Sequence, residues 1–512
     1  MTQRRPLSGS SPGDEGIVHS DAWREELGEN WVGWVPIFAL LIFTMGASAP
    51  LADIDLPMHL ATGAWIVKQH AVPFVEPFAW TRAGAPFYAY SWLPEVIYFL
   101  SYAYAGPLLL RTLHGLTLAT GGLALLWVAR TAGWRAWTAV QLCFLSLFVE
   151  AIVFAYLRPQ ALLFPAVLLA WGCGLRVLND PRPASWVVLL VLIAAVSANS
   201  HLLFPLTALP LAIAISRTPF PLRRGALIAG ALLCGWLLTP YALYWPEIFR
   251  LYFGHNLLFD YPSPISEVAP GFRTAAQYGP LALAIAVLAI APSLVRYDTL
   301  STRARLTFSS LWLIGLFGYG LAARALVVWW IATLPLLVLA LDRIPAPRPR
   351  IRIVMLLTMA SFPLLLGFRS LRLAHTFGGG IASPVAMSVE PLATWLDEHA
   401  RPSRRPRVLT SLNYGSYLNW RLPDYSMSVD GRTIFPDSAA APDAYRLVGD
   451  ERSSLGPWQT ADLAILPVQF PAAKVLDTAQ DWVRIDTVAE GPDVPMSLGL
   501  WCRRSWLSAS RR

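Results

Sequence analysis

Long runs of apolar residues dominate the first two thirds of the chain. Runs that could cross about 30 Å of hydrocarbon as helices occur at 34–50, 107–129, 138–156, 160–178, 185–200, 203–216, 225–244, 278–295, 307–322, 325–341 and 351–367. A helix satisfies its own backbone hydrogen bonds in lipid, so each run predicts a helix. The pattern therefore predicts an all-α polytopic membrane domain of about eleven spans over residues 31–367. The short runs at 185–200 and 203–216 can instead form a re-entrant pair.

After residue 367 the pattern changes to short apolar stretches separated by Pro, Arg, Asp and Ser. Strand-like segments occur at 407–412, 425–429, 461–466, 482–486 and 497–501, and helix-like segments at 389–400 and 437–450. The alternation of short strands with helices is typical of a layered α/β unit. Residues 368–512 are therefore expected to form a small α/β domain.

Composition and charge place these two parts relative to a membrane. The chain is 55% hydrophobic and only 14% charged, with a mean hydropathy of +0.48. Residues 1–30, rich in Ser, Gly and Pro, are expected to form a disordered cytoplasmic tail, and residues 92–104 to lie in the outer interface. With this orientation, most arginines of the short loops fall on the cytoplasmic side, as is typical of membrane proteins. This arrangement predicts an inner-membrane protein with its α/β domain outside. The net charge of +8 follows from these loops and does not indicate nucleic-acid binding.

The same orientation collects the polar residues that interrupt or flank the apolar runs on the outer face. They are Asp53, Asp55, His59, Arg158, Asn199, His201, Glu267 and Arg324. Ionisable groups at membrane depth are costly and usually mark a functional site. One site near the Asp-x-Asp loop at 51–92 is the expectation.

These motifs resemble the uncharacterised bacterial branch of GT-C-type membrane glycosyltransferases, in the superfamily of the protein mannosyltransferases and aminoarabinose transferases. The resemblance rests on an ordered series: Asp53, Asp55, His59 and Gly63; Trp92, Leu93 and Glu95; Arg158, Pro159 and Gln160; Asn199 and His201; Pro240 and Tyr241; Ser266 and Glu267; Arg324; Gly415, Tyr417 and Leu418; and Asp430, Gly431 and Arg432. In this sequence Val268 follows Glu267, where relatives often carry Trp.

The resemblance implies inverting transfer of a sugar from a polyprenyl-phosphate donor to a glycan, lipid or protein acceptor of the cell envelope. Asp53 is the expected base, and Asp55 a hydrogen-bonding partner or, if Mg²⁺ or Mn²⁺ takes part, its ligand. Arg158 and Arg324 are expected to bind the lipid phosphate. The other expected substrate-binding residues are His59, Glu95, Asn199, His201 and Glu267.

Each assignment has a structural alternative. Asp53 and Asp55 can cap an interfacial helix, arginines at span ends can reach for lipid headgroups, and Asn199 and His201 can satisfy backbone groups at a helix break. Asp430, Gly431 and Arg432 read as a turn after a strand and are left out of the catalytic set. Two other functions stay open, a non-catalytic scaffold for envelope assembly and a lipid or solute transporter.

Overall fold

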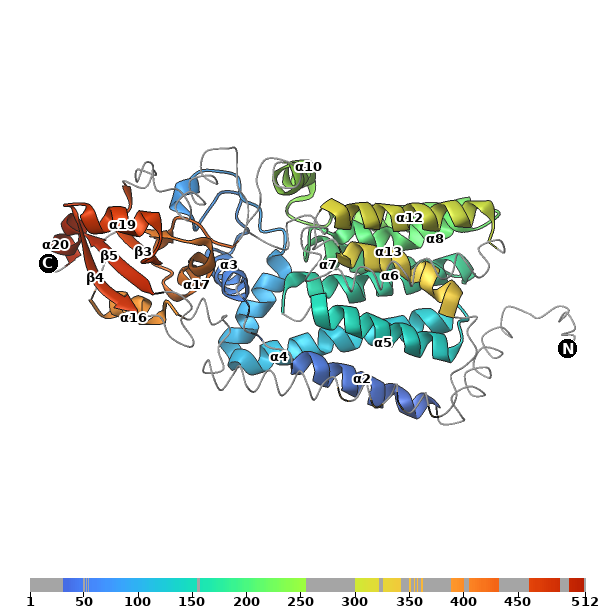
Figure 1. Ribbon diagram of the computed structural model, residues 1–512. Coiled ribbons are helices and arrows are strands. Elements are labelled where there is room, and N and C mark those ends of the chain that lie inside the picture. The colour runs from blue at the N-terminus through green and yellow to red at the C-terminus, as the bar shows by residue number, and fades with distance from the viewer. Residues whose placement is uncertain are drawn as a thin grey trace, which may run out of the picture.

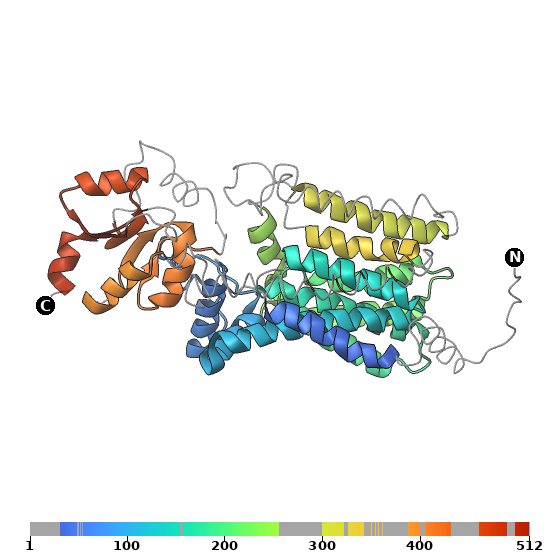
Figure 2. The same cartoon turned by 60° about the horizontal axis from the view of Figure 1, so that its bottom comes forward.

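The structure is a computed structural model that describes residues 31–48, 51, 53, 55–153, 157–254, 300–321, 326–341, 350, 354, 357, 361, 388–399, 405–431, 460–488 and 497–510. The helices of the first part form one bundle, which we call the helical domain, and the sheet with its helices forms the α/β domain (Figure 1). Helix α3 and the first half of α4 lie between the two in both views (Figures 1 and 2).

The helical domain follows the predicted apolar runs closely. Its helices are α2 (Trp31–Ala47), α3 (Leu56–Gln69), η1 (Trp80–Arg82), α4 (Trp92–Thr131), α5 (Ala136–Val153), η2 (Pro159–Leu162), α6 (Leu163–Asn179), α7 (Ala184–Ala198), η3 (Phe204–Ala208), α8 (Leu209–Ser216), α9 (Leu222–Leu237), η4 (Ala242–Tyr244), α10 (Trp245–Phe249), η5 (Arg250–Gly254), α12 (Thr302–Leu321) and α13 (Leu326–Leu341). The predicted run at 278–295 lies outside the described residues, as does nearly all of 351–367.

The expected number of spans is not confirmed. Among the described residues, two helices are long and apolar enough to cross a bilayer, Trp92–Thr131 and Pro159–Asn179. A third is added if Leu222–Leu237 and Ala242–Tyr252, which meet at a bend of 102°, are one broken span. Four further apolar helices in the described segments are shorter.

Helix α4 contains the break that its sequence predicts. Ala105 and Gly106 leave the helical conformation, and Gly106 has φ +60°, a value that favours glycine. Pro107 follows, and its ring disfavours helical geometry in the residue before it. The bend therefore separates the segment expected in the interface, 92–104, from the run expected to span, 107–129.

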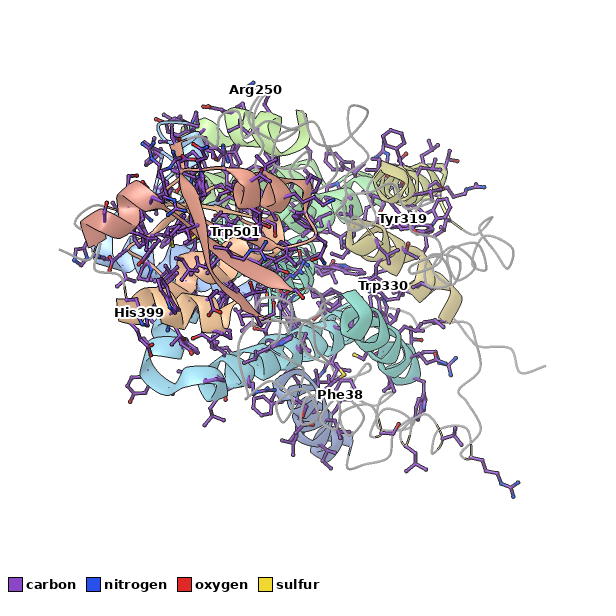
Figure 3. All side chains as sticks on the ribbon, turned by 60° about the vertical axis from the view of Figure 1, so that its left-hand side comes forward. Phe38, Arg250, Tyr319, Trp330, His399 and Trp501 are labelled. Atoms are coloured by element: carbon purple, nitrogen blue, oxygen red, sulfur yellow. The ribbon has the colours of Figure 1, made fainter. Side chains whose placement is uncertain are left out.

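Two apolar clusters hold the helical domain together. One joins α4, α5, α6, α12 and α13 around Trp329 and Trp330. The other joins α6, α7, α8 and α9 around Ile228 and Leu232. In the view of Figure 3, Trp330 and Tyr319 lie in the helical domain, to the right of the sheet that carries Trp501.

The α/β domain contains all five predicted strands. They form one mixed sheet in the order β2-β1-β3-β5-β4, with parallel pairing from β2 to β3 and antiparallel pairing from β3 to β4. The bounds are β1 (Arg407–Thr410), β2 (Ser426–Met427), β3 (Leu463–Pro467), β4 (Trp482–Val488) and β5 (Leu498–Arg503), with helices α16 (Glu390–His399), α17 (Leu412–Arg421), α19 (Pro471–Thr478) and α20 (Arg504–Ser510). The helix expected at 437–450 lies outside the described residues.

Side-chain alternation along the strands explains why the sheet is covered on both faces. Leu463 and Ile465 of β3 pack with α16 and α17, whereas Ala464 and Leu466 pack with α19. Successive side chains of a strand point to opposite faces, so an uninterrupted apolar strand needs a helix layer on each side.

The loop between α3 and α4, residues 70–91, connects the two domains. Ala79 bridges Met427 of β2 in parallel, and Thr81 Oγ1 donates to the Ser428 carbonyl at 2.5 Å. At the other end, Tyr241 Oη donates to the Pro73 carbonyl at 2.9 Å and accepts from Ala89 N at 3.2 Å. The loop therefore covers the β2 edge of the sheet and is fixed to the helical domain.

Aromatic side chains strengthen the attachment of this loop to the helical domain. Phe74, Tyr88 and Tyr241 pack edge to face, and Tyr88 Oη donates to Glu247 Oε2 at 2.9 Å. Burial, together with this hydrogen bond, raises the pKa of Tyr88 to about 12, so its hydroxyl stays a donor at neutral pH.

Candidate functional site

Both carboxylates of the Asp-x-Asp motif contact one arginine. Arg158 donates from Nε to Asp53 Oδ2 at 2.7 Å and from Nη2 to Asp53 Oδ1 at 3.0 Å. Its Nη2 also lies 3.1 Å from Asp55 Oδ2. The paired geometry on Asp53 is the strong bidentate arrangement of guanidinium and carboxylate. Two carboxylates thus share one positive charge.

Burial makes this cluster energetically sensitive. The side chain of Asp53 is 3% exposed, that of Arg158 15% and that of Asp55 21%. Removing one member of a buried pair leaves an uncompensated charge and costs several kcal/mol. Asp55 is the more open carboxylate, and it therefore has better access to a molecule that enters from outside.

Local sequence places Arg158 at this point. It precedes Pro159, so its backbone is extended (φ −119°, ψ 154°), and the short helix η2 starts directly after it. The Ala161 amide closes this turn by donating to the Arg158 carbonyl at 2.9 Å.

Asp55 lies at the start of α3, as the capping alternative expects, but it does not cap the helix by a hydrogen bond. An N-cap side chain would accept from an amide of the first turn. The Asp55 carboxylate approaches Arg158 instead.

A second polar pair lies one helical turn further along α3. His59 Nδ1 is 2.9 Å from Glu95 Oε1, and both side chains are largely buried. Asp55, His59 and Gly63 are spaced by four residues, which places them along one face of the helix. Gly63 permits the pair, because a Cβ there would lie 2.1 Å from the Glu95 carbonyl oxygen.

We expect Gly63→Ala to separate α3 from α4 and to lower the melting temperature in detergent. The clash is with backbone rather than with a mobile side chain, and overpacking of this kind costs about 1–3 kcal/mol. Gly230→Ala is the control, since a Cβ at Gly230 has nothing within 4 Å. Equal melting temperatures for the two variants would contradict the close approach of α3 and α4.

Asn199 connects three elements. Its Oδ1 accepts from Trp92 Nε1 at 2.6 Å, and its Nδ2 donates to the carbonyls of Ala195 and Leu238, each at 2.8 Å. Its backbone carbonyl also accepts from Leu93 N. These contacts fit the structural alternative, and they fix the start of α4 and thereby Glu95.

His201 lies beyond the same break. Its Nδ1 accepts from Leu203 N at 3.1 Å, and its ring packs edge to face on Tyr90, which in turn packs on Tyr252. Glu267 and Arg324 lie outside the described residues, so their assignments stay predictions.

A metal role for Asp55 also stays a prediction. Over the part of the chain that the structure describes, no group of three or more His, Cys, Asp or Glu side chains is arranged to hold a metal ion. Asp53 and Asp55 both contact Arg158.

Sequence reasoning left one part of the site out. A Cβ placed on Gly431 would lie 2.9 Å from Asp55 Oδ1 and 2.8 Å from Ser416 Oγ. The α/β domain therefore reaches the Asp-x-Asp motif through the turn that follows β2. One feature could have indicated this turn. Strands β1 and β2 are parallel neighbours, so the segments that follow them, including the turn at Gly431, lie at the same edge of the sheet.

Comparison with known proteins defines the fold. No protein-family model matches the sequence, and no curated protein matches it. Among solved structures, archaeal oligosaccharyltransferase AglB from Archaeoglobus fulgidus, in complex with an inhibitory peptide and a dolichol-phosphate, superposes with a TM-score of 0.61 at 11% identity over 87% of this chain and 70% of AglB.

Two further solved structures have a similar fold. ArnT from Cupriavidus metallidurans in the apo state gives a TM-score of 0.57 at 14% identity, covering 93% of this chain and 98% of ArnT. Arabinofuranosyltransferase AftD from Mycobacteria gives 0.53 at 15% identity over 92% of this chain, which spans only 40% of AftD. The chain therefore has a GT-C-type glycosyltransferase fold.

Proposed function

We propose that this protein transfers a sugar from a polyprenyl-phosphate donor to an acceptor at the outer face of the membrane. The observation that carries the proposal is the pair Asp53 and Asp55, gathered on Arg158 at the start of α3. The fold supports it, because solved structures of this fold include ArnT bound to undecaprenyl phosphate. Likeness of fold alone does not define a reaction, whereas the residues of a site do.

In the proposed reaction, an acceptor hydroxyl oxygen attacks the anomeric carbon of the donor. The new bond joins that oxygen to the sugar, the bond from the anomeric carbon to the phosphate oxygen breaks, and polyprenyl phosphate leaves with the bonding electrons. Asp53 takes the acceptor proton as a general base, and Asp55 orients the acceptor. Arg158 fixes Asp53 through its two hydrogen bonds, and in this proposal its guanidinium also binds the phosphate of the lipid donor.

The remaining predicted residues have supporting roles in this proposal. His59 and Glu95 line the α3 side of the site, and Asn199 and His201 hold the helix break beside it. Glu267 is proposed to bind the substrate and Arg324 the lipid phosphate. Mg²⁺ or Mn²⁺ would be held through Asp55 if the reaction needs a metal. The proposed orientation places the N-terminus in the cytoplasm and the α/β domain outside.

The test is release of polyprenyl phosphate by purified protein from a panel of polyprenyl-phosphate sugars, with a panel of hydroxyl acceptors and with Mg²⁺, Mn²⁺ or a chelator. We expect turnover with at least one donor. In sealed vesicles, we expect it only with donor presented on the side that carries the α/β domain.

Absence of turnover with every donor and acceptor, from protein that stays monodisperse and melts cooperatively, would reject the transferase proposal. Movement of a lipid-linked sugar across sealed vesicles without sugar transfer would favour a transporter instead. Loss of turnover with chelator, restored by one cation, would establish the metal requirement.

A further inference from the structure

The turn at Asp430 and Gly431 lies against the carboxylate of Asp55. The space beside Gly431 is too small for a Cβ, which would come within 2.9 Å of Asp55 Oδ1 and 2.8 Å of Ser416 Oγ. Contacts this short require a neighbouring atom to move. Glycine at this position therefore allows the α/β domain to approach Asp55, the more exposed of the two carboxylates.

Helix α17 holds this turn through two side chains. Ser416 Oγ accepts from Gly431 N at 2.9 Å, and Asn419 Nδ2 donates to Asp430 Oδ2 at 2.8 Å. Ser416 and Asn419 are three residues apart on one face of the helix. Both are buried, as is Asp430, so these hydrogen bonds are shielded from water.

The same helix is fixed to the helical domain. Trp420 of α17 packs edge to face on Phe99 and Tyr102 of α4, with ring centroids 6.2 and 5.5 Å apart. Trp420 also packs against the apolar cluster that contains Leu56 and Leu60 of α3. Helix α17 thus contacts both the turn at Gly431 and α3, the helix that begins directly after Asp55.

We propose that Gly431 is a positioning residue for Asp55 and that the α/β domain completes the active site. The turn limits the Asp55 carboxylate on one side, and Arg158 limits it on the other. This inference rests on the proposed glycosyltransferase function. It adds that turnover requires the α/β domain to be seated with Gly431 beside Asp55, because catalytic groups must be held to within about 0.5 Å.

Gly431→Ala tests the proposal. The two atoms that the new Cβ would meet are the ends of side chains, so the chain can fold while Asp55 moves by a few tenths of an ångström. A misplacement of about 1 Å can cost about a hundredfold in rate, and we expect a loss of about tenfold in kcat with a smaller change in KM. Gly230→Ala, where a Cβ has open space, is expected to keep the wild-type rate.

Ser416→Ala separates positioning from simple damage to the turn. Gly431→Ala introduces a methyl group between Ser416 Oγ and Asp55 Oδ1. Without the Ser416 Oγ, this methyl group has room to shift away from Asp55. Ser416→Ala should therefore restore part of the activity of Gly431→Ala. If glycine serves only the turn, losing the Ser416 hydrogen bond adds to the damage and the double variant is worse. A wild-type rate in Gly431→Ala, or losses that add, would overturn the proposal and leave the transferase function standing.

A stability measurement decides the contact even without turnover. In detergent, we expect Gly431→Ala to lower the melting temperature, and Asp55→Ala to reduce that loss by removing the carboxylate that the methyl meets. The expected result is therefore coupling between the two substitutions in a double-mutant cycle of melting temperatures. Independent effects would overturn the placement of Gly431 beside Asp55.

Discussion

Asp53→Asn is expected to lower kcat for sugar transfer by about a thousandfold, in the middle of the range for loss of a general base. Asparagine has nearly the same shape, but it cannot take the acceptor proton, and its amide group would present donors to Arg158 where the carboxylate presents acceptors. The measurement is the rate of polyprenyl phosphate release as a function of pH, with the melting temperature as a check on folding.

The control for Asp53→Asn is Asp481→Asn, which weakens an exposed ion pair with Arg503 in the α/β domain. Exposed pairs contribute about 0–1 kcal/mol to stability, so the control should keep the wild-type rate and melting temperature. Asp55→Asn completes the set. A near-normal rate in Asp53→Asn together with a thousandfold loss in Asp55→Asn would transfer the role of base to Asp55, the more exposed carboxylate.

Much of the fold could be predicted because periodicity is a local property of the sequence. The apolar runs predicted most of the long helices of the helical domain, although not α3, and the short apolar stretches after residue 400 predicted all five strands. Helix α17 was missed because its ten residues mix polar and apolar side chains between two short strand candidates. A helix of that length owes its stability to packing rather than to propensity, so the sequence carries little local signal for it.

The site was partly predictable for a different reason. Asp53 and Arg158 are 105 residues apart, but the predicted membrane orientation places both on one face, and this was enough to expect them in one site. The pairing of His59 with Glu95 depends on the close packing of α3 on α4 at Gly63, which no local pattern reports. The contact between Gly431 and Asp55 depends in addition on the seating of a second domain, and a short turn motif alone does not encode that arrangement.

The break at Asn199 shows how a structural alternative can matter for a site. The sequence allowed either a ligand or a residue that satisfies backbone groups. The Asn199 side chain hydrogen-bonds to Ala195, Leu238 and Trp92, the last of which lies at the start of α4. In the proposed transferase, we expect a residue of this kind to affect activity through the position of α4, and so of Glu95.

Arg158→Gln is expected to destabilise the protein by about 3–5 kcal/mol, because it leaves the carboxylate of Asp53 buried without this guanidinium. Asp55 is more exposed and can recover hydration, so Asp53 accounts for most of the loss. The measurement is chemical or thermal unfolding in a fixed detergent. Asp481→Asn, which changes the exposed partner of the ion pair with Arg503, is again the control and should cost about 1 kcal/mol or less.

Adding Asp53→Asn to Arg158→Gln should restore most of the stability, since two neutral amides can hydrogen-bond where the ion pair was and neither charge of that pair remains. It should restore none of the activity, because both the base and the positive charge beside the leaving group are gone. This opposite response of stability and rate separates a catalytic cluster from a structural one. If the double variant regained turnover, the cluster would serve folding alone and the reaction would need another base; if Arg158→Gln were as stable as wild type, the buried pairing of Arg158 with Asp53 would be wrong.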